Sequence, residues 1–208
     1  MHRIIIATFI SYLIGSIPTA YIFGRLLKGI DIRNFGSGNV GTTNALRVLG
    51  RWPGIAVLAF DILKGFIPVV FLGNFLSPQI NYMPQEVWRI ILGLGSIAGH
   101  SWTVFLNFKG GKGIATSFGV LLGLAIKIPG LKIILVLLIL SWFLIFILTR
   151  IVSLASILCA VLLPVYMLLF RQTLTLTISS LILSIFVILR HRSNLQRLWL
   201  GKEPRLKF

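Results

Sequence analysis

Residues 152–170, VSLASILCAVLLPVYMLLF, carry no charged side chain over nineteen positions. A helix needs about 20 mainly apolar residues to cross a bilayer, so this stretch alone is long enough to span one. Similar apolar stretches recur along the whole chain, and we therefore expect one membrane-embedded domain over residues 1–208. Together they predict an all-α, polytopic integral membrane protein with seven transmembrane helices, over residues 4–27, 54–75, 87–106, 114–128, 131–149, 152–170 and 174–189.

The composition supports the membrane class. Hydrophobic residues make up 57% of the 208 positions, and twenty Lys and Arg against four Asp and Glu give a formal charge of +16. In a soluble protein that charge would suggest nucleic acid as a partner. Here the basic residues crowd at the ends of apolar stretches, where they anchor to anionic lipid and set topology. We expect the lipid bilayer, and no nucleic acid, as a partner, and an anionic substrate for the glycine-rich loops.

Several spans have irregular features. The first is interrupted by residues 15–19, GSIPT, and a proline inside a membrane helix frees a carbonyl and usually kinks the helix. It has no small-residue cleavage site, so we expect it to be retained. In the second span Asp61 and Lys64 stand at i, i+3 and can neutralise each other on one helical face. The spans over 114–128 and 131–149 are the least certain, and either could be broken or re-entrant.

The distribution of Lys and Arg between the loops predicts the orientation. The larger set belongs in the cytoplasm, which places the N-terminus outside and the C-terminus inside. The polar passages that follow spans one, three and seven are separated by even numbers of spans, so we expect all three to face the cytoplasm. The cytoplasmic set is Lys28, Arg33, Arg47, Arg51, Lys109, Lys112, Arg150, Arg190, Arg192, Arg197, Lys202, Arg205 and Lys207. The opposite set is Arg3, Arg89, Lys127, Lys132 and Arg171.

The longest polar passage is residues 36–47, GSGNVGTTNALR. Its glycines let the backbone approach a ligand closely, and it combines small hydroxyls and amides with a guanidinium. That mixture suits an oxyanion, most simply a phosphate. A flexible linker between two helices is the alternative. The candidate binding residues are Ser37, Gly38, Asn39, Thr43, Asn44 and Arg47.

A second polar passage joins Gly99-His100-Ser101 to residues 108–116, FKGGKGIAT. A Gly-Gly-Lys-Gly turn that leads into a helix offers free N–H groups and a lysine charge with no Cβ in the way, which makes an anion cradle. It is not a Walker A loop, because glycine follows the lysine and no strand precedes it, so we do not expect ATP binding. A tight turn whose charges only set topology is the alternative. The candidates are Lys109, Gly110, Gly111, Lys112 and Gly113, with His100 assigned a structural role.

The third polar passage is residues 190–203, RHRSNLQRLWLGKE. A basic tail usually anchors a protein to the lipid surface. That role does not account for His191 and Asn194, which share a face at i, i+3 if the seventh helix continues. Glu203 is either a counter-ion to loop arginines or a general base.

The chain is poor in other catalytic groups. Its three scattered histidines and four isolated carboxylates show no metal-ligand spacing, so we expect no metal and no cofactor. There is no G-x-S-x-G, and the single Cys159 lies in an apolar span, which excludes a disulfide framework and a cysteine-based metal site. Such an inventory suits a reaction that needs positioning and charge neutralisation more than proton chemistry by side chains.

Together the three passages closely resemble the bacterial membrane acyl-phosphate:glycerol-3-phosphate acyltransferase family, the PlsY type. Its members read GSGN-x-G-A-T-N-x-x-R, then G-H-x-x-P-V-F-x-x-F-K-G-G-K-G-x-A-T, then R-H-x-x-N-x-x-R-L-x-x-G-x-E. The matching residues here are 36–47, 99–116 and 190–203, with secondary matches at 15–18, 61–65 and 152–156. The resemblance covers essentially the whole chain, and its three motifs are jointly specific.

Three positions depart from the family pattern. Thr42 stands where alanine is usual, Thr103 where proline is usual, and Asn107 where the family often has glycine. The change at Thr103 could loosen the start of the second loop without abolishing activity.

The resemblance implies an enzyme that transfers a fatty acyl group from acyl phosphate to the sn-1 hydroxyl of glycerol 3-phosphate. The products would be lysophosphatidic acid and inorganic phosphate, in the first step of phospholipid synthesis. It implies direct transfer, with no acyl-enzyme and no use of acyl-CoA or acyl carrier protein. We expect a monomer in the bacterial cytoplasmic (inner) membrane, with its active site facing the cytoplasm.

The resemblance also implies roles for individual residues. Ser37, Arg47, Lys112 and Ser156 would hold substrate phosphates, and Asn39 and Thr43 would shape the first loop. His191 and Asn194 would orient glycerol phosphate and its hydroxyl, with Glu203 structural. The catalytic candidates are thus His191, Asn194, Ser37, Arg47 and Lys112, and either His191 or the leaving phosphate acts as the base.

A rival interpretation is a membrane transporter of anions or phosphate esters, in which glycine-broken helices and cations line the pathway. Such transporters usually place charge near the bilayer midplane and show inverted repeats, and the sequence shows neither. An enzyme therefore remains the favoured interpretation.

Overall fold

The computed structural model describes residues 2–79 and 82–206, and these residues form helices and connecting loops with no strand among them. The predicted all-α class is therefore confirmed. By its internal contacts the chain divides into two compact units, residues 1–127 and 128–208. The single functional domain over residues 1–208 stays a prediction.

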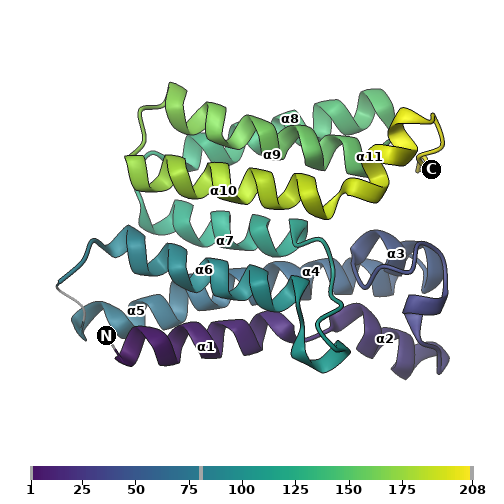
Figure 1. Cartoon of the computed structure of the whole chain (residues 1–208), viewed down its shortest axis with the longest axis horizontal. Coiled ribbons are helices and arrows are strands. Elements are labelled where there is room, and N and C mark those ends of the chain that lie inside the picture. Colours follow the sequence, from purple (N-terminus) through teal and green to yellow (C-terminus); the bar gives the residue numbers. More distant parts are fainter. Residues whose placement is uncertain (1, 80–81, 207–208) are drawn as a thin grey trace. The chain divides into compact units, whose positions relative to one another are not determined.

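The first unit is organised around two helix pairs (Figure 1). α1 packs against α6, α4 packs against α7, and α6 also contacts α7. The elements are α1 (His2–Ser16), α2 (Thr19–Lys28), η1 (Ile32–Asn34), α3 (Thr42–Val48), α4 (Arg51–Ile67), η2 (Pro68–Leu72), α5 (Gly73–Leu76), η3 (Ser77–Gln79), α6 (Gln85–Ser101), η4 (Val104–Leu106) and α7 (Ile114–Lys127).

Glycines bring the paired helices of this unit close together. A Cβ at Gly15 would collide with the carbonyl oxygen of Ser96, and one at Gly99 would collide with that of Tyr12, so α1 and α6 touch backbone to backbone. α4 and α7 approach in the same way at Gly65. Because lipid tails are as apolar as the helices, such close packing of small residues is a main source of cohesion in a membrane bundle.

In the described part of the second unit, α9 (Val152–Leu169) packs against both α8 (Leu131–Thr149) and α10 (Leu174–Arg190). The short helix α11 (Arg192–Trp199) follows α10 at an angle of 62° (Figure 1). Pro164 lies inside α9 without ending it. The sequence predicts one helical face for His191 and Asn194 on the condition that the seventh helix continues. The bend after α10 shows that it does not continue as one straight helix.

The helices confirm a multi-pass membrane protein. In the described part of the chain, five stretches are long and apolar enough to cross a bilayer, and α10 with α11 would add a sixth if the bent pair is one span. α7 is apolar but has only 14 residues, so the predicted fourth span is a short one. The number of seven crossings stays a prediction. The five stretches are His2–Lys28, Arg51–Leu76, Gln85–Leu106, Leu131–Thr149 and Val152–Leu169.

Arg89 lies near the start of the predicted third span, but it is not the interfacial residue that the count of topology charges assumed. It is 1% exposed within α6 and donates hydrogen bonds to the carbonyl of Val69 at 2.5 Å and to Oδ1 of Asn74 at 2.9 Å. Its guanidinium also lies over the ring of Trp88, 4.5 Å from the centroid. The stretch η2 is π-helical, which disturbs the regular backbone bonding,. Arg89 therefore serves this irregular backbone and is not an interfacial topology signal.

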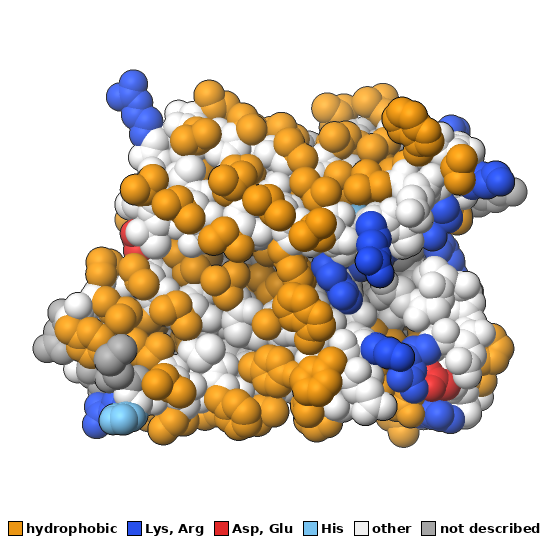
Figure 2. Space-filling model, in the orientation of Figure 1, with side chains coloured by type: hydrophobic (Ala, Val, Ile, Leu, Met, Phe, Trp, Pro, Cys, Tyr) orange, Lys and Arg blue, Asp and Glu red, His pale blue; other side chains and the backbone are white. Residues whose placement is uncertain are grey.

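Many basic side chains gather at one end of each unit, although Figure 2 also shows isolated blue side chains at the left edge of the view. On the face drawn in Figure 2, blue Lys and Arg side chains lie near α2 and α3 in the first unit and near α11 in the second, while orange apolar side chains cover the long helices. That both basic ends face the cytoplasm stays a prediction. Lys207 and part of the loop over residues 77–84 lie outside the described residues.

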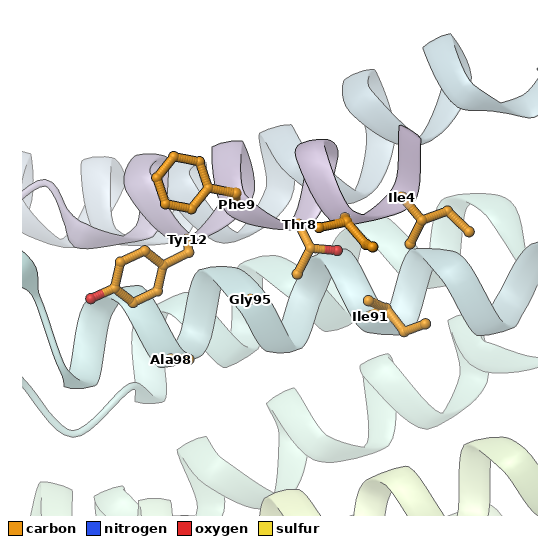
Figure 3. A pocket seen from close by; sticks show the side chains of 8 residues that line it. Ile4, Thr8, Phe9, Tyr12, Ile91, Gly95 and Ala98 are labelled. Atoms are coloured by element: carbon orange, nitrogen blue, oxygen red, sulfur yellow. The ribbon is translucent and has the colours of Figure 1, made fainter. Parts of the chain in front are cut away.

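An apolar groove of about 550 Å³ runs along α1 and α6 (Figure 3). Ile4, Phe9 and Tyr12 of α1 and Ile91 and Gly95 of α6 contribute to its lining. No charged side chain lines it, so it suits hydrocarbon and offers nothing to a phosphate. The anion-binding chemistry of the first unit must therefore reside elsewhere.

The close contact between α1 and α6 predicts that Gly99→Val lowers stability. The new side chain would meet the Tyr12 carbonyl, and such overpacking typically costs about 1–3 kcal/mol. We expect a clear drop in the melting temperature of the detergent-purified protein. Leu94→Val, on a more exposed face of α6, is the control and should melt near the wild-type temperature. Equal melting of Gly99→Val and wild type would show that the two helices can separate freely.

Candidate functional site

Asn44 organises the first polar loop from within. Its side chain is 1% exposed; Nδ2 donates to the carbonyls of Ile32 at 3.3 Å and Phe35 at 3.1 Å, and Oδ1 accepts from the Ser37 amide at 2.8 Å. Gly36 passes this amide at φ +60°, where a Cβ would collide with Oδ1. The Asn44 side chain therefore holds the loop in shape, which is a supporting role for a residue predicted to bind phosphate.

Other residues of this loop remain open to a ligand. Ser37, Gly38 and Arg47 are exposed, and Asn39 and Thr43 are half-buried. Within the described residues, the buried Oδ1 of Asn39 has no hydrogen-bond partner. An acceptor of this kind, held beside exposed hydroxyl and guanidinium groups, suits a ligand that carries both hydroxyls and phosphate oxygens.

The stem below the loop is fixed by ion pairs that involve other arginines. Arg33 donates to Asp31 through Nη2 at 2.7 Å and through Nε at 3.0 Å, and Arg25 lies 3.9 Å from the same carboxylate. The hydrogen bond from Arg33 is the main reason that the pKa of Asp31 falls from 3.8 to about 2. Both guanidinium groups also lie over the ring of Tyr21. Arg25 and Arg33 are thus committed to the stem, which distinguishes them from Arg47.

The second polar loop folds back on the end of α6. The amides of Gly110 and Gly111 donate to the carbonyls of Ser101 and His100 at 3.1 and 3.0 Å. Lys109 is exposed, Lys112 is half-buried, and α7 begins at Ile114 directly after Gly113. The predicted turn of glycines and lysine that leads into a helix is therefore present. The expectation of free N–H groups is wrong for Gly110 and Gly111, because both amides are bonded within the protein.

The structure shows the surroundings of two of the three residues that depart from the family pattern, Asn107 and Thr103. Asn107 adopts φ +52°, a left-handed conformation that glycine and asparagine tolerate better than other residues. Thr103 is buried, and its hydroxyl donates to the Ser16 carbonyl at 2.5 Å while accepting from the Phe105 amide at 3.3 Å. Thr103 thus ties the loop to the end of α1, and a looser loop than one with proline stays a prediction.

A buried hydrophobic cluster joins the two loops at one end of the first unit. Val40 of the first loop and Leu106 of the second both belong to it. The remaining members come from α2, η1, α3, its C-terminal cap and α4, and they are Ala20, Ile32, Ala45, Leu49 and Val57. The prediction that the first two polar passages share one face is therefore confirmed within this unit.

In the second unit, Glu203 is the centre of the third polar cluster. Its Oε1 accepts from Oγ of Ser153 at 2.7 Å and from Nδ2 of Asn194 at 2.6 Å, and its Oε2 accepts from Nε of Arg197 at 2.7 Å. Burial by itself raises the pKa of Glu203, but these three hydrogen bonds and the charge of Arg197 outweigh it, so the pKa lies below the ordinary 4.5. An ionised, fully bonded Glu203 holds Asn194, in agreement with a structural role.

His191 stands at the bend between α10 and α11. Its Nδ1 lies 2.8 Å from the Val187 carbonyl, which can only accept, so Nδ1 carries a hydrogen. In the neutral ring Nε2 is then the nitrogen that can take a proton. His191 and Asn194 are 3% and 5% exposed. The bend, rather than a continuous helix, sets their relative orientation.

The structure adds Ser153 to this cluster and specifies the surroundings of Ser156. Oγ of Ser156 accepts from the indole of Trp142 at 3.3 Å and is buried. Ser153 instead contacts Glu203, fifty residues further along the chain. The sequence offered one signal for Ser153, its place in the match over residues 152–156, but assigned it no role. Across the described residues, no group of three or more His, Cys, Asp and Glu side chains could hold a metal ion.

The fold and these clusters define a multi-pass helical membrane protein with glycine-bearing basic loops suited to oxyanions. The family model for glycerol-3-phosphate acyltransferase matches residues 5–201. The chain belongs to the glycerol-3-phosphate acyltransferase family.

Relatives and solved structures agree with this assignment. A glycerol-3-phosphate acyltransferase of Gloeobacter violaceus is 44% identical over 94% of this chain and 91% of its own length. One of Fusobacterium nucleatum is 41% identical over 96% of each chain. The crystal structure of PlsY (YgiH), an integral membrane glycerol 3-phosphate acyltransferase in its glycerol 3-phosphate form, matches with TM-score 0.85 and 34% identity over 98% of this chain and 96% of that one. The lysophosphatidic acid form matches with TM-score 0.82 and 33% identity, over 98% and 95% of the two chains.

The lowered pKa of Glu203 predicts an acid-sensitive second unit. A carboxylate whose pKa is depressed on folding stabilises the fold above its unfolded pKa, and this contribution is lost as the pH falls through the folded value. We expect the melting temperature of the wild type to fall as the pH drops from neutral to below 4.5. Glu203→Gln should start lower at neutral pH and change less. Parallel curves for the two proteins would contradict this ion-pair role.

Proposed function

We propose that the chain transfers a fatty acyl group from acyl phosphate to the sn-1 hydroxyl of glycerol 3-phosphate. The products are lysophosphatidic acid and inorganic phosphate, the transfer is direct, and the reaction is the first step of phospholipid synthesis. The observation that carries this proposal is the cluster through Val40 and Leu106, which brings two basic, glycine-bearing loops to the same end of the first unit. Two such loops suit a reaction in which both substrates carry a phosphate.

The chemistry needs little from side chains as acids or bases. The glycerol oxygen attacks the carbonyl carbon of the acyl phosphate, the bond between that carbon and the phosphate oxygen breaks, and phosphate leaves with the electron pair. The leaving phosphate takes the hydroxyl proton, so atoms and charge balance without an acyl-enzyme. Cations at Arg47 and Lys112 and the Ser37 hydroxyl stabilise charge that develops on the carbonyl and phosphate oxygens.

The third polar cluster orients the acceptor in this proposal. The bond from Asn194 to Glu203 fixes the plane of the amide, and the bond from His191 to Val187 fixes the imidazole. The amide oxygen of Asn194 and Nε2 of His191 then form hydrogen bonds with glycerol 3-phosphate. Ser156 is a further phosphate contact. The remaining phosphate contacts are Gly38, Asn39, Thr43, Lys109 and Gly113. Asn44, Gly110 and Gly111 instead shape the loops, because their polar groups are already bonded within the protein.

The proposed setting is the bacterial cytoplasmic membrane. The chain crosses it seven times as a monomer, with the N-terminus outside and all three polar clusters facing the cytoplasm. The basic ends of the two units support this orientation, because Lys and Arg are retained on the cytoplasmic side. Acyl phosphate enters from the bilayer, where the apolar surfaces of the helices accept its tail.

The reaction is tested with the detergent-purified protein, glycerol 3-phosphate and acyl phosphate. We expect phosphate release with stoichiometric lysophosphatidate. Arg47→Ala and Lys112→Ala should each lower turnover about 10²–10³-fold, as removal of a charge-stabilising donor typically does. Lys132→Ala, an exposed cation at the start of α8, is the matched control and should keep full activity. Counterflow of glycerol 3-phosphate in liposomes without any acyl transfer would establish the transporter instead.

The role of His191 is tested by comparing His191→Gln with His191→Ala. If the leaving phosphate takes the proton, glutamine retains much more activity than alanine, because its amide can replace the orienting hydrogen bond. The pH dependence of turnover should then be the same in His191→Gln and wild type. A base would behave differently: both variants would lose activity to the same extent, and the acid limb of the pH profile would disappear.

A further inference from the structure

A buried polar cluster in the first unit lies outside the loops proposed to bind phosphate. Asp61 and Lys64 of α4 form an ion pair at 2.7 Å, and Oδ1 of Asp61 also accepts from the Thr19 hydroxyl at 2.6 Å. Nδ1 of His100, near the end of α6, lies 3.8 Å from the same oxygen. All four residues are at most 6% exposed. Buried charges are costly within a membrane and usually have a function.

Part of this cluster closes the break in the first span. Pro18 has no N–H to continue the helix, and the Ile17 carbonyl at the break accepts from Nζ of Lys64 at 3.1 Å. The Thr19 hydroxyl holds the start of α2 to Asp61. Repair of the backbone thus accounts for Thr19, Asp61 and Lys64, but it does not require a histidine from α6.

His100 connects this cluster to the second loop. Its carbonyl accepts the Gly111 amide at 3.0 Å. The imidazole also lies directly against Gly111, because a Cβ at that position would collide with the ring around Nε2. Asp61 is therefore on one side of the imidazole and the loop backbone is on the other, and the next residue along the loop is Lys112.

We propose that Thr19, Asp61, Lys64 and His100 are positioning residues for the lysine loop of the acyltransferase. The Asp61 carboxylate, held by Lys64 and Thr19, restrains the imidazole of His100 through a contact of 3.8 Å, which is longer than a hydrogen bond,. The imidazole in turn provides the wall against which Gly111 packs, and this contact sets the path of the backbone at Lys112. The role assigned to Lys112 rests on the proposed function, whereas the restraint on the loop does not.

A restrained loop favours substrate binding because less conformational entropy of the loop is lost when the substrate binds. A phosphate-binding cation that must be ordered on each binding event lowers affinity through the entropy of ordering. Release of the imidazole should therefore weaken substrate binding more than it slows the chemical step. The expected kinetic signature is a rise in KM for the phosphorylated substrate with a smaller change in kcat.

Asp61→Asn removes the charge and keeps an oxygen that accepts from Thr19. We expect amide hydrogen exchange over residues 107–113 to accelerate about tenfold, together with a comparable rise in KM for glycerol 3-phosphate or acyl phosphate. His100→Gln, which leaves the ion pair intact, should do the same. Ser11→Ala is the control. Ser11 is buried and donates to the Leu92 carbonyl between α1 and α6. The variant should therefore lose stability without contacting the loop, and it should change neither the exchange rate nor KM.

The double variant Asp61→Asn with Lys64→Gln separates positioning from plain stability. A single neutralisation leaves an uncompensated buried charge, and the second change removes that charge. We expect the melting temperature to recover toward the wild type while loop exchange and KM stay raised. If the melting temperature, the loop exchange and KM all recovered, the cluster would serve stability alone and the proposal would be overturned. Unchanged loop exchange in a folded His100→Gln variant would overturn it as well. Faster exchange in a protein that transfers no acyl group would uphold the restraint and reject the proposed function.

Discussion

The bilayer core provides no water to satisfy backbone polar groups, and the protein meets this constraint wherever its helices are irregular. Three irregular points are each matched with a buried nitrogen from a side chain. Lys64 donates to the carbonyl at the break before α2, Arg89 donates to the π-helical stretch, and His191 bonds the carbonyl of Val187 at the bend after α10. The carbonyls of Ile17 and Val187 also accept backbone amides, from Thr19 and His191, so at these two points the side chain adds a second hydrogen bond. An unsatisfied carbonyl in hydrocarbon would cost several kcal/mol.

Two of these three nitrogens are near the proposed chemistry, and the third is not. Lys64 is paired with Asp61 close to the second loop, and His191 belongs to the third polar cluster. Arg89 packs with Trp88 near the start of α6, away from both loops. A buried cation in a membrane segment therefore indicates an irregular backbone first, and a catalytic role only where polar loops adjoin it.

Much of the fold could be predicted from the sequence because apolar length is a local property. The spans over 54–75 and 152–170 needed only a count of residues, and the i, i+3 spacing of Asp61 and Lys64 predicted their ion pair. Contacts between distant residues could not be predicted in this way. The bond from Thr103 to Ser16 joins positions 87 apart, and no periodicity reports it. Arg89 was counted among the charges that set topology, because a basic residue near a span end looks the same whether it faces lipid headgroups or a buried carbonyl.

The candidate site shows the same division between local and distant information. The turn of glycines and lysine before α7 could be read from its own residues, whereas the inward-facing amide of Asn44 could not. The bond between Ser153 and Glu203 spans fifty positions and ties the first turn of α9 to the tail. Because Glu203 comes fifty residues after Ser153, the first turn of α9 has no such partner until the polypeptide through Glu203 has been made. This end of the second unit therefore closes later than α9 itself forms, however early that helix enters the membrane.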